Sequence, residues 1–106
     1  MTIFDRREEA FEKKFAIDEE QKFKAEARRN RLLGLWVAEK LGLSGDAANA
    51  YARQVVAADF EGPGHGAARK VMDDLAAEGV AVTEPELRDK MDELMAQAIV
   101  QVRAGK

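Results

Sequence analysis

The chain has 106 residues, of which 46% are hydrophobic and 35% are charged, and its formal net charge is -3. This length suits one domain with a single modest core, the acidic balance argues against a nucleic-acid-binding protein, and the lack of cysteine excludes disulfides, thiolate zinc sites and a cysteine nucleophile. No apolar run approaches the roughly 20 residues of a membrane span and no signal peptide is recognisable, so we expect a cytoplasmic protein that does not insert into a membrane.

The first thirty residues contain neither glycine nor proline and are dominated by Glu, Lys, Arg, Ala and Gln, which favour helix. Glu20 and Lys24 stand four residues apart, a spacing that adds about 0.2–0.5 kcal/mol to an isolated helix. On such a helix Phe4, Phe11 and Phe15 fall within about 40° of one another. These three rings form a narrow apolar stripe, the Phe stripe, on an otherwise charged segment. The stripe needs a partner, which is either the rest of this chain or another protein.

The composition changes at RRNRLLGLWVAEKLGLSGD, where apolar residues appear on all sides from Leu32 to Leu43 and predict a buried helix. Arg28, Arg29 and Arg31 come just before it. One interpretation is a basic collar at the point where a solvated helix enters the core, with Trp36 as the anchor. The other is an anion site, for example for a nucleotide phosphate, beside an aromatic ring able to stack on the base.

Three further helices follow. The first runs from about Gly45 to Phe60 and is expected to turn Tyr51, Val55 and the edge from Val56 to Phe60 toward the core, and EGPGHG ends it. A short helix covers about 67 to 78, with Val71, Met72 and Leu75 inward and a glycine as its stop.

The last helix opens at TEPE, where Thr83 as N-cap and Glu86 three residues later form a capping-box pattern. Its apolar stripe comprises Leu87, Met91, Leu94, Ala98 and Val102. No stretch alternates with a period of two residues, so a sheet is not expected. The sequence therefore predicts an all-α protein, a small four-helix bundle with a long N-terminal helix whose first 18 or so residues are flexible or only partly helical in the free protein.

No residue pattern indicates a catalytic or metal site. His65 is the only histidine and lies in a Gly/Pro loop without Cys, Asp or Glu at ligand spacing. Asp73 and Asp74 are adjacent and point about 100° apart on a helix, while Glu84 and Glu86 occupy a first turn, where acids complement the helix dipole. Three methionines are expected to fill the core: Met72, Met91 and Met95. We expect no enzyme, no metal and no cofactor.

The stretch FDRREEAFEKKFAIDEEQKFKAEARRNRLLGLWVAEKLGLSG resembles the opening of the zeta-subunit family, the ATPase inhibitors of F-type ATP synthases in alphaproteobacteria. The similarity extends over the DFE segment before GPG and the late ELRDKMDELM helix, and the block from Ala27 to Gly45 is its most specific part. The resemblance implies a four-helix bundle whose N-terminal segment inserts into a catalytic subunit interface of the synthase and blocks rotation in the hydrolytic direction.

Carried onto this sequence, the resemblance implies an inhibitory segment at residues 1–19 and a bundle at residues 20–106. The partner would be the catalytic head, with its alpha, beta and gamma subunits, at the cytoplasmic side of the inner membrane. The partner-binding residues would be Phe4, Arg6, Arg7, Phe11, Lys13, Lys14 and Phe15. Some family members bind adenine nucleotides, for which the candidate residues here are Arg28, Arg29, Arg31 and Trp36.

Two other functions are open at this point. The chain could be a helical adaptor that self-associates through the Phe stripe, although the next ring, Phe23, lies about 80° off the stripe and breaks the coiled-coil spacing. It could also be a bundle that is regulated by adenine nucleotides through its arginines. We expect the free protein to be a monomer.

Overall fold

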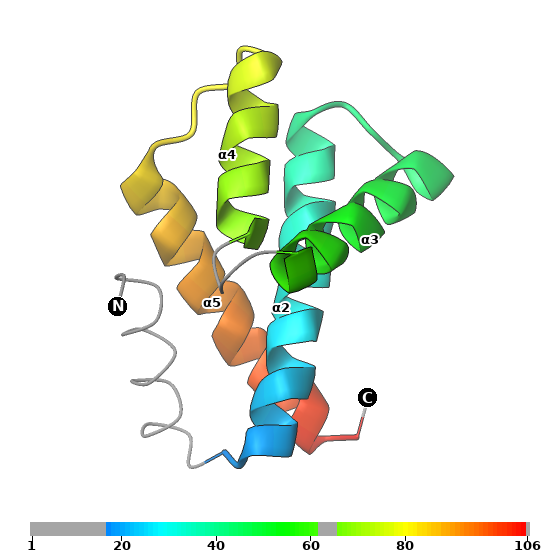
Figure 1. The fold of residues 1–106 in the computed structure, drawn as a ribbon, viewed down its shortest axis with the longest axis vertical. Coiled ribbons are helices and arrows are strands. Elements are labelled where there is room, and N and C mark those ends of the chain that lie inside the picture. The colour runs from blue at the N-terminus through cyan, green and yellow to red at the C-terminus, as the bar shows by residue number, and fades with distance from the viewer. Residues whose placement is uncertain (1–16, 62–65, 106) are drawn as a thin grey trace.

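The computed structural model describes residues 17–61 and 66–105, which form four α-helices and no strand (Figure 1). The helices are α2 (Glu19–Lys40), α3 (Gly45–Glu61), α4 (Gly66–Ala77) and α5 (Glu84–Arg103). The predicted all-α bundle is confirmed. The Phe stripe and His65 lie outside the described residues.

The long helix α2 begins at Glu19 because Asp18 caps it. Asp18 has an extended backbone (φ -87°, ψ 176°), and its carboxylate accepts a hydrogen bond of 2.8 Å from the backbone N–H of Gln21. The Gln21 side chain accepts one of 3.4 Å from the backbone N–H of Asp18, which completes a capping box. The first residue of α2, Glu19, is also the last residue of the predicted inhibitory segment, residues 1–19. The predicted pair of Lys24 with Glu20 is present at 3.1 Å.

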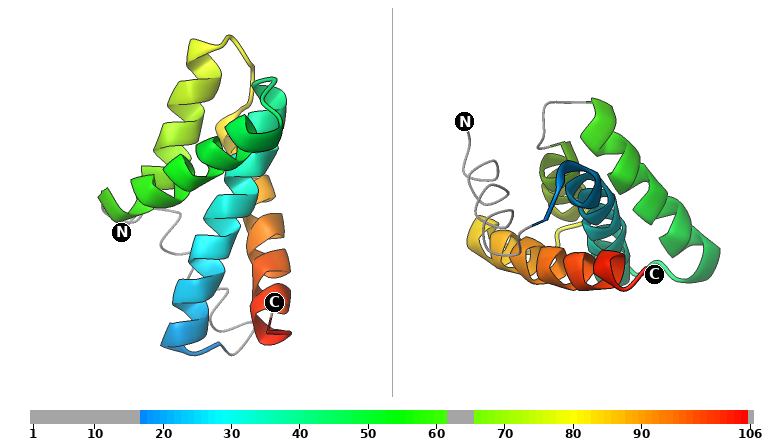
Figure 2. Two further views of the ribbon diagram at one scale, coloured as in Figure 1. Left: turned by 90° about the vertical axis from the view of Figure 1, so that its right-hand side faces the viewer. Right: turned by 90° about the horizontal axis from the view of Figure 1, so that it is seen from below.

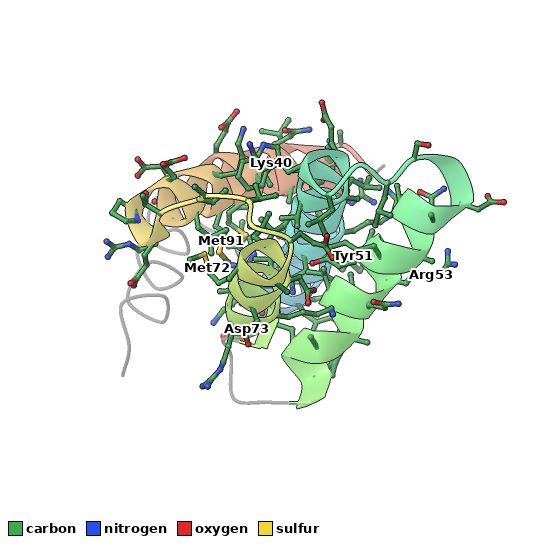
Figure 3. All side chains as sticks on the ribbon, turned by 90° about the horizontal axis from the view of Figure 1, so that it is seen from above. Lys40, Tyr51, Arg53, Met72, Asp73 and Met91 are labelled. Atoms are coloured by element: carbon green, nitrogen blue, oxygen red, sulfur yellow. The ribbon has the colours of Figure 1, made fainter. Side chains whose placement is uncertain are left out.

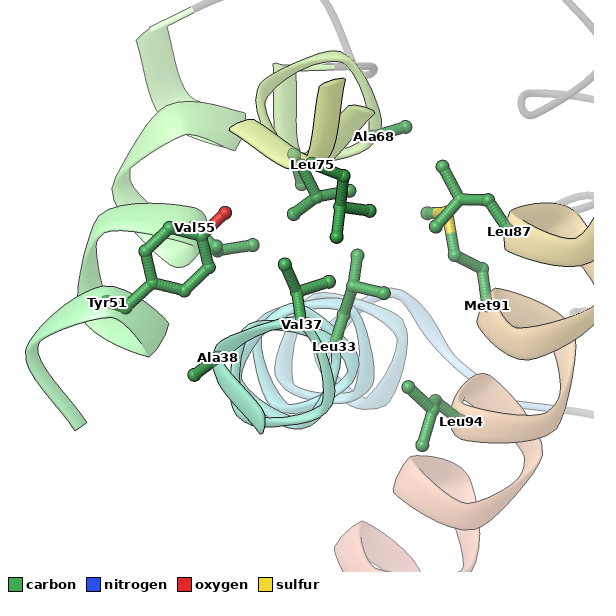
Figure 4. Packing of buried hydrophobic residues seen from close by; sticks show 12 residues of the cluster. Leu33, Val37, Ala38, Tyr51, Val55, Ala68, Leu75, Leu87, Met91 and Leu94 are labelled. Atoms are coloured by element: carbon green, nitrogen blue, oxygen red, sulfur yellow. The ribbon is translucent and has the colours of Figure 1, made fainter. Parts of the chain in front are cut away.

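Helix α2 is the centre of the bundle, with α3 crossing it and α5 running beside it (Figure 2). Gly34 of α2 allows the close crossing, because a Cβ atom at this position would lie 2.6 Å from the Cα atom of Ala52 in α3. Leu33 and Val37 are fully buried and point toward Val55 and Leu75 (Figure 4). The predicted buried helix is confirmed here, although its last residues, Glu39 and Lys40, are exposed.

The core has a large upper cluster and a smaller lower one. The upper cluster joins all four helices and includes Tyr51, Leu75, Leu87 and Met91, as the sequence predicts (Figure 4). The lower cluster lies where the first turns of α2 meet the end of α5, and it consists of Ala25, Met95, Ala98 and Ile99. Met72 and Trp36 are half-buried and pack against the upper cluster. The methionines therefore fill the core, as expected.

The prediction for the end of α3 was wrong in one respect. Phe60 was expected to face the core, but 66% of it is exposed. Its ring packs instead on Phe23 of α2, also 57% exposed, with the two ring centroids 6.0 Å apart. The reason is that α3 crosses α2, so that Asp59 in its last turn faces Asn30 of α2 and the start of α4, while the neighbouring Phe60 lies on the outer side beside Phe23.

The helix ends follow the predicted local signals. After α4, Gly79 has a φ of 68° and the N–H of Val80 returns to the carbonyl of Leu75 at 2.9 Å, a glycine C-cap. Thr83 caps α5 as predicted, by accepting a hydrogen bond of 3.2 Å from the N–H of Glu86, but the capping box is only half formed because the Glu86 carboxylate accepts from the Thr83 hydroxyl instead of its backbone N–H. No helix within the described ranges is long and apolar enough to cross a membrane.

Candidate functional site

The predicted partner-binding residues all belong to the segment 1–16, outside the described ranges. This set, which comprises Phe4, Arg6, Arg7, Phe11, Lys13, Lys14 and Phe15, therefore stays a prediction. The structure does define where that segment joins the bundle. Ile17 packs against the lower core cluster, and Asp18 is fixed as the cap of α2. The segment is thus attached at the end of the bundle where α2 starts and α5 finishes (Figure 1).

The four predicted nucleotide-binding residues do not converge on one site. Arg29 is only 5% exposed, and its Nε and Nη2 atoms both donate to Asn30 Oδ1, at 3.2 and 3.0 Å. Asn30 Nδ2 in turn donates to Asp59 Oδ2 of α3 at 2.8 Å, and Arg29 Nη2 lies 3.8 Å from the same oxygen. The other carboxylate oxygen of Asp59 accepts from the N–H of Ala67 in the first turn of α4, at 3.3 Å. Arg29 is therefore part of a buried polar network that joins α2, α3 and α4.

Trp36 lies on a different part of α2. Its half-buried ring is flanked by two lysines, with Lys40 Nζ 4.7 Å and Lys90 Nζ 5.4 Å from the ring centroid. Both distances suit a cation–π interaction. Figure 3 shows Lys40 on the side of α2 that is next to α5. In this structure Arg29 and Trp36 each contact residues that hold the bundle together. A nucleotide site built from all four predicted residues stays a prediction.

Arg28 and Arg31 lie instead in an open groove of about 680 Å³ between α2, α3 and the C-terminal end of α5. We call this the basic groove. Its lining consists of Lys24, Ala27, Arg28, Arg31, Arg53, Val56, Val102 and Gly105. Arg28 Nη1 donates to Gln101 Oε1 of α5 at 3.3 Å, so this side chain is held in place. Arg31 and Arg53 are exposed and form no ion pair with any residue in the described ranges.

Sequence reasoning missed Arg53 and the exposed pair Phe23 and Phe60. Arg53 comes from α3, 22 positions after Arg31, and only the crossing of the two helices brings it to the groove. The signal for the aromatic pair was available in part, because Phe23 was seen to lie off the Phe stripe. Its partner could not be found without knowing how far α3 extends.

Of the two adjacent aspartates in α4, Asp73 and Asp74, Asp74 takes part in contacts that hold the fold together. Tyr51 donates a hydrogen bond of 2.7 Å to Asp74 Oδ2, and Lys70 Nζ lies 3.1 Å from the same oxygen, while Asp73 is exposed. Burial raises the pKa of the Tyr51 hydroxyl above its ordinary value, and the hydrogen bond to Asp74 and the charge of that carboxylate raise the pKa further. The described ranges contain no group of three or more His, Cys, Asp or Glu residues that could hold a metal ion.

Comparison with known proteins identifies the family. The family model of ATPase inhibitor subunit zeta matches residues 1–101, which include the N-terminal segment as well as the bundle. A structure solved by solution NMR is 55% identical in sequence and superposes with a TM-score of 0.68 over 80% of this chain and 98% of that chain. No curated protein matches the chain in sequence. Since the family match spans nearly its whole length, the chain belongs to the ATPase inhibitor subunit zeta family.

Proposed function

We propose that this protein inhibits ATP hydrolysis by the F-type ATP synthase. Residues 1–19 insert into a catalytic subunit interface of the synthase head, whose alpha, beta and gamma subunits are the partners, and block rotation in the hydrolytic direction. The observation that carries this proposal is the family match over residues 1–101, which includes both the inserting segment and the bundle. The protein acts as a monomer that reaches the cytoplasmic side of the inner membrane through the synthase, without entering the membrane.

The core of the bundle supports this division of roles. Leu33, Val37 and Val55 are 0% exposed and are packed among residues of the four helices. The described residues therefore form a core that joins all four helices, and the proposal assigns the Phe stripe to a partner. Burying three phenylalanines contributes about 1.5–3 kcal/mol each. Ordering some eighteen backbone residues costs about 1–2 kcal/mol each before hydrogen bonds form.

Binding through the Phe stripe alone is therefore insufficient, and the inserting segment needs either preformed helix or wider contacts. Four cations in the same segment supply such contacts in the proposal: Arg6, Arg7, Lys13 and Lys14. A helix that enters the interface from outside is held more tightly as the catalytic site closes on it and is released as the site opens. Inhibition should consequently be strong for hydrolysis and weak for synthesis.

The test compares the intact protein with a variant that lacks residues 1–16. This truncation keeps Ile17, which packs in the lower core cluster, and Asp18, which caps α2, so the bundle should stay folded. Rates of ATP hydrolysis and of proton-driven ATP synthesis are measured on the same membrane vesicles. We expect the intact protein to suppress hydrolysis far more than synthesis and the truncated protein to suppress neither. Full inhibition by the truncated protein, or equal suppression in both directions, would contradict the proposal.

A further inference from the structure

The basic groove is unusual for a chain with a net charge of -3, because four cations converge on it: Lys24, Arg28, Arg31 and Arg53. Beneath them the lining is apolar, with Ala27 and Val56 from the crossing helices and Val102 from α5. A cationic rim over an apolar floor offers charge and hydrophobic contact at the same place. This combination suits an amphipathic segment that carries carboxylates.

Part of this charge has a role within the fold. Lys24 pairs with Glu20, and Arg28 donates to Gln101 near the end of α5, where a cation offsets the partial negative charge of the helix C-terminus. Arg31 and Arg53 have no such role within the described ranges. Asp46 and Asn49 share a neighbouring hollow with both arginines, and no ion pair among the described residues joins Asp46 to either of them. Their guanidinium groups thus keep their donors for a partner.

We propose that the basic groove is a second docking surface for the synthase head, and that it receives a carboxylate-bearing, amphipathic segment of a head subunit. Arginine binds carboxylates through two parallel hydrogen bonds, which gives orientation as well as attraction. The proposal rests on the proposed function, because it takes the synthase head as the partner.

The position of the groove relative to the N-terminal segment supports this assignment. Lys24, Arg28 and Arg31 follow one another at helical spacing along α2, and α2 starts directly after that segment. The groove begins in the second turn of the helix, so a partner that holds residues 1–16 stands next to it. An exposed cationic surface acts mainly on the rate of encounter, and its effect falls as salt rises.

The experiment uses the full chain and three variants, which are Arg53→Glu, the double variant Arg31→Glu/Arg53→Glu, and Arg69→Glu as the matched control. Arg69 is exposed on α4, away from the groove lining, and its substitution changes the charge by the same amount as Arg53→Glu. Association of the labelled protein with purified synthase head is measured at about 50 and about 300 mM salt. We expect association to slow by about threefold for Arg53→Glu and by about tenfold or more for the double variant, with the control within about twofold. The differences should shrink at the higher salt concentration.

Circular dichroism melting establishes that the variants are folded, and Arg31→Gln/Arg53→Gln replaces the double variant if it is not. Association of the double variant as fast as that of Arg69→Glu overturns the groove proposal and leaves the proposed function intact. If the groove variants associate more slowly but the intact protein does not inhibit ATP hydrolysis, the proposed function is overturned and the groove proposal stands. A further arm follows the Arg31 and Arg53 side-chain NMR signals with tripolyphosphate and with the head. Shifts with tripolyphosphate but not with the head would assign the groove to a small anion and overturn the proposal.

Discussion

Arg29 and Arg31 lie two residues apart on α2, yet their surroundings are opposite. Arg29 is buried and bonded to Asn30 beside Asp59, whereas Arg31 is exposed on the rim of the basic groove. A separation of two residues turns a side chain by about 200° around the helix, so neighbours in sequence face different parts of the protein. The comparison teaches that a run of basic residues is not a functional unit, since the helix divides it between the fold and the surface.

The largest expected effect comes from removing Asp59, one of the groups that interact with Arg29 in the buried network. Asp59→Ala removes the carboxylate that lies 3.8 Å from Arg29 Nη2 and accepts hydrogen bonds from Asn30 Nδ2 and from the N–H of Ala67. Breaking a buried pair in this way costs about 3–5 kcal/mol, so we expect a loss of that size in the free energy of unfolding. Urea denaturation monitored by circular dichroism measures it.

The double variant Arg29→Met/Asp59→Ala serves as the control for this prediction. It removes the buried charge together with its partner, and it should recover much of the lost stability because an apolar replacement of a buried pair is often neutral. If Asp59→Ala alone cost less than about 1 kcal/mol, Arg29 would not depend on Asp59, and the contrast with Arg31 would lose its basis.

The local features of the fold were predictable because their causes are local. Thr83 as an N-cap, Gly79 as a C-cap and the stripe from Leu87 onward each depend on residues within one or two turns. The separate surroundings of Arg28, Arg29 and Arg31 were not predictable, because Leu32 to Leu43 is apolar on all sides and gives no direction to the helix.

The buried network around Arg29 and the basic groove could not be predicted from the sequence, because both are built from residues far apart in the chain. Asn30 and Asp59 are 29 positions apart, and Arg53 reaches the groove only because Gly34 lets α3 cross close to α2. A single sequence contains no local signal for such a crossing. The family resemblance did identify the protein's class from the sequence, because it rests on a long block of residues and not on a site.

The hydrogen bond between Tyr51 of α3 and Asp74 of α4 is a second polar contact within the fold, and its loss should cost less stability than the loss of Asp59. Tyr51→Phe removes the hydroxyl that donates to Asp74 and should lower the free energy of unfolding by about 1 kcal/mol at neutral pH. Denaturation of the two proteins at pH 7 measures this difference.

The same hydroxyl predicts a pH dependence. Its pKa is raised in the folded protein by burial, by the hydrogen bond to Asp74 and by the charge of that carboxylate. Above a pH of about 10 the unfolded chain loses this proton more readily than the folded one, so stability falls as pH rises, by up to about 1.4 kcal/mol per pH unit. The stability is fully present below that pH. Since Tyr51 is the only tyrosine, Tyr51→Phe should lack this contribution, and parallel curves for the two proteins above pH 10 would contradict the assignment.

The smallest expected effect on stability belongs to the exposed arginines. Arg31→Gln and Arg53→Gln remove charges that form no ion pair with the described residues, so each should change the free energy of unfolding by less than about 0.5 kcal/mol. Removing both charges also removes the repulsion between them, which offsets part of any loss. The measurement is urea denaturation at low salt, where such repulsion is least screened, with Arg69→Gln as the control. A loss of more than about 1 kcal/mol for either variant would show that the basic rim holds the bundle together, as Arg29 does, and would remove the distinction between the two arginines.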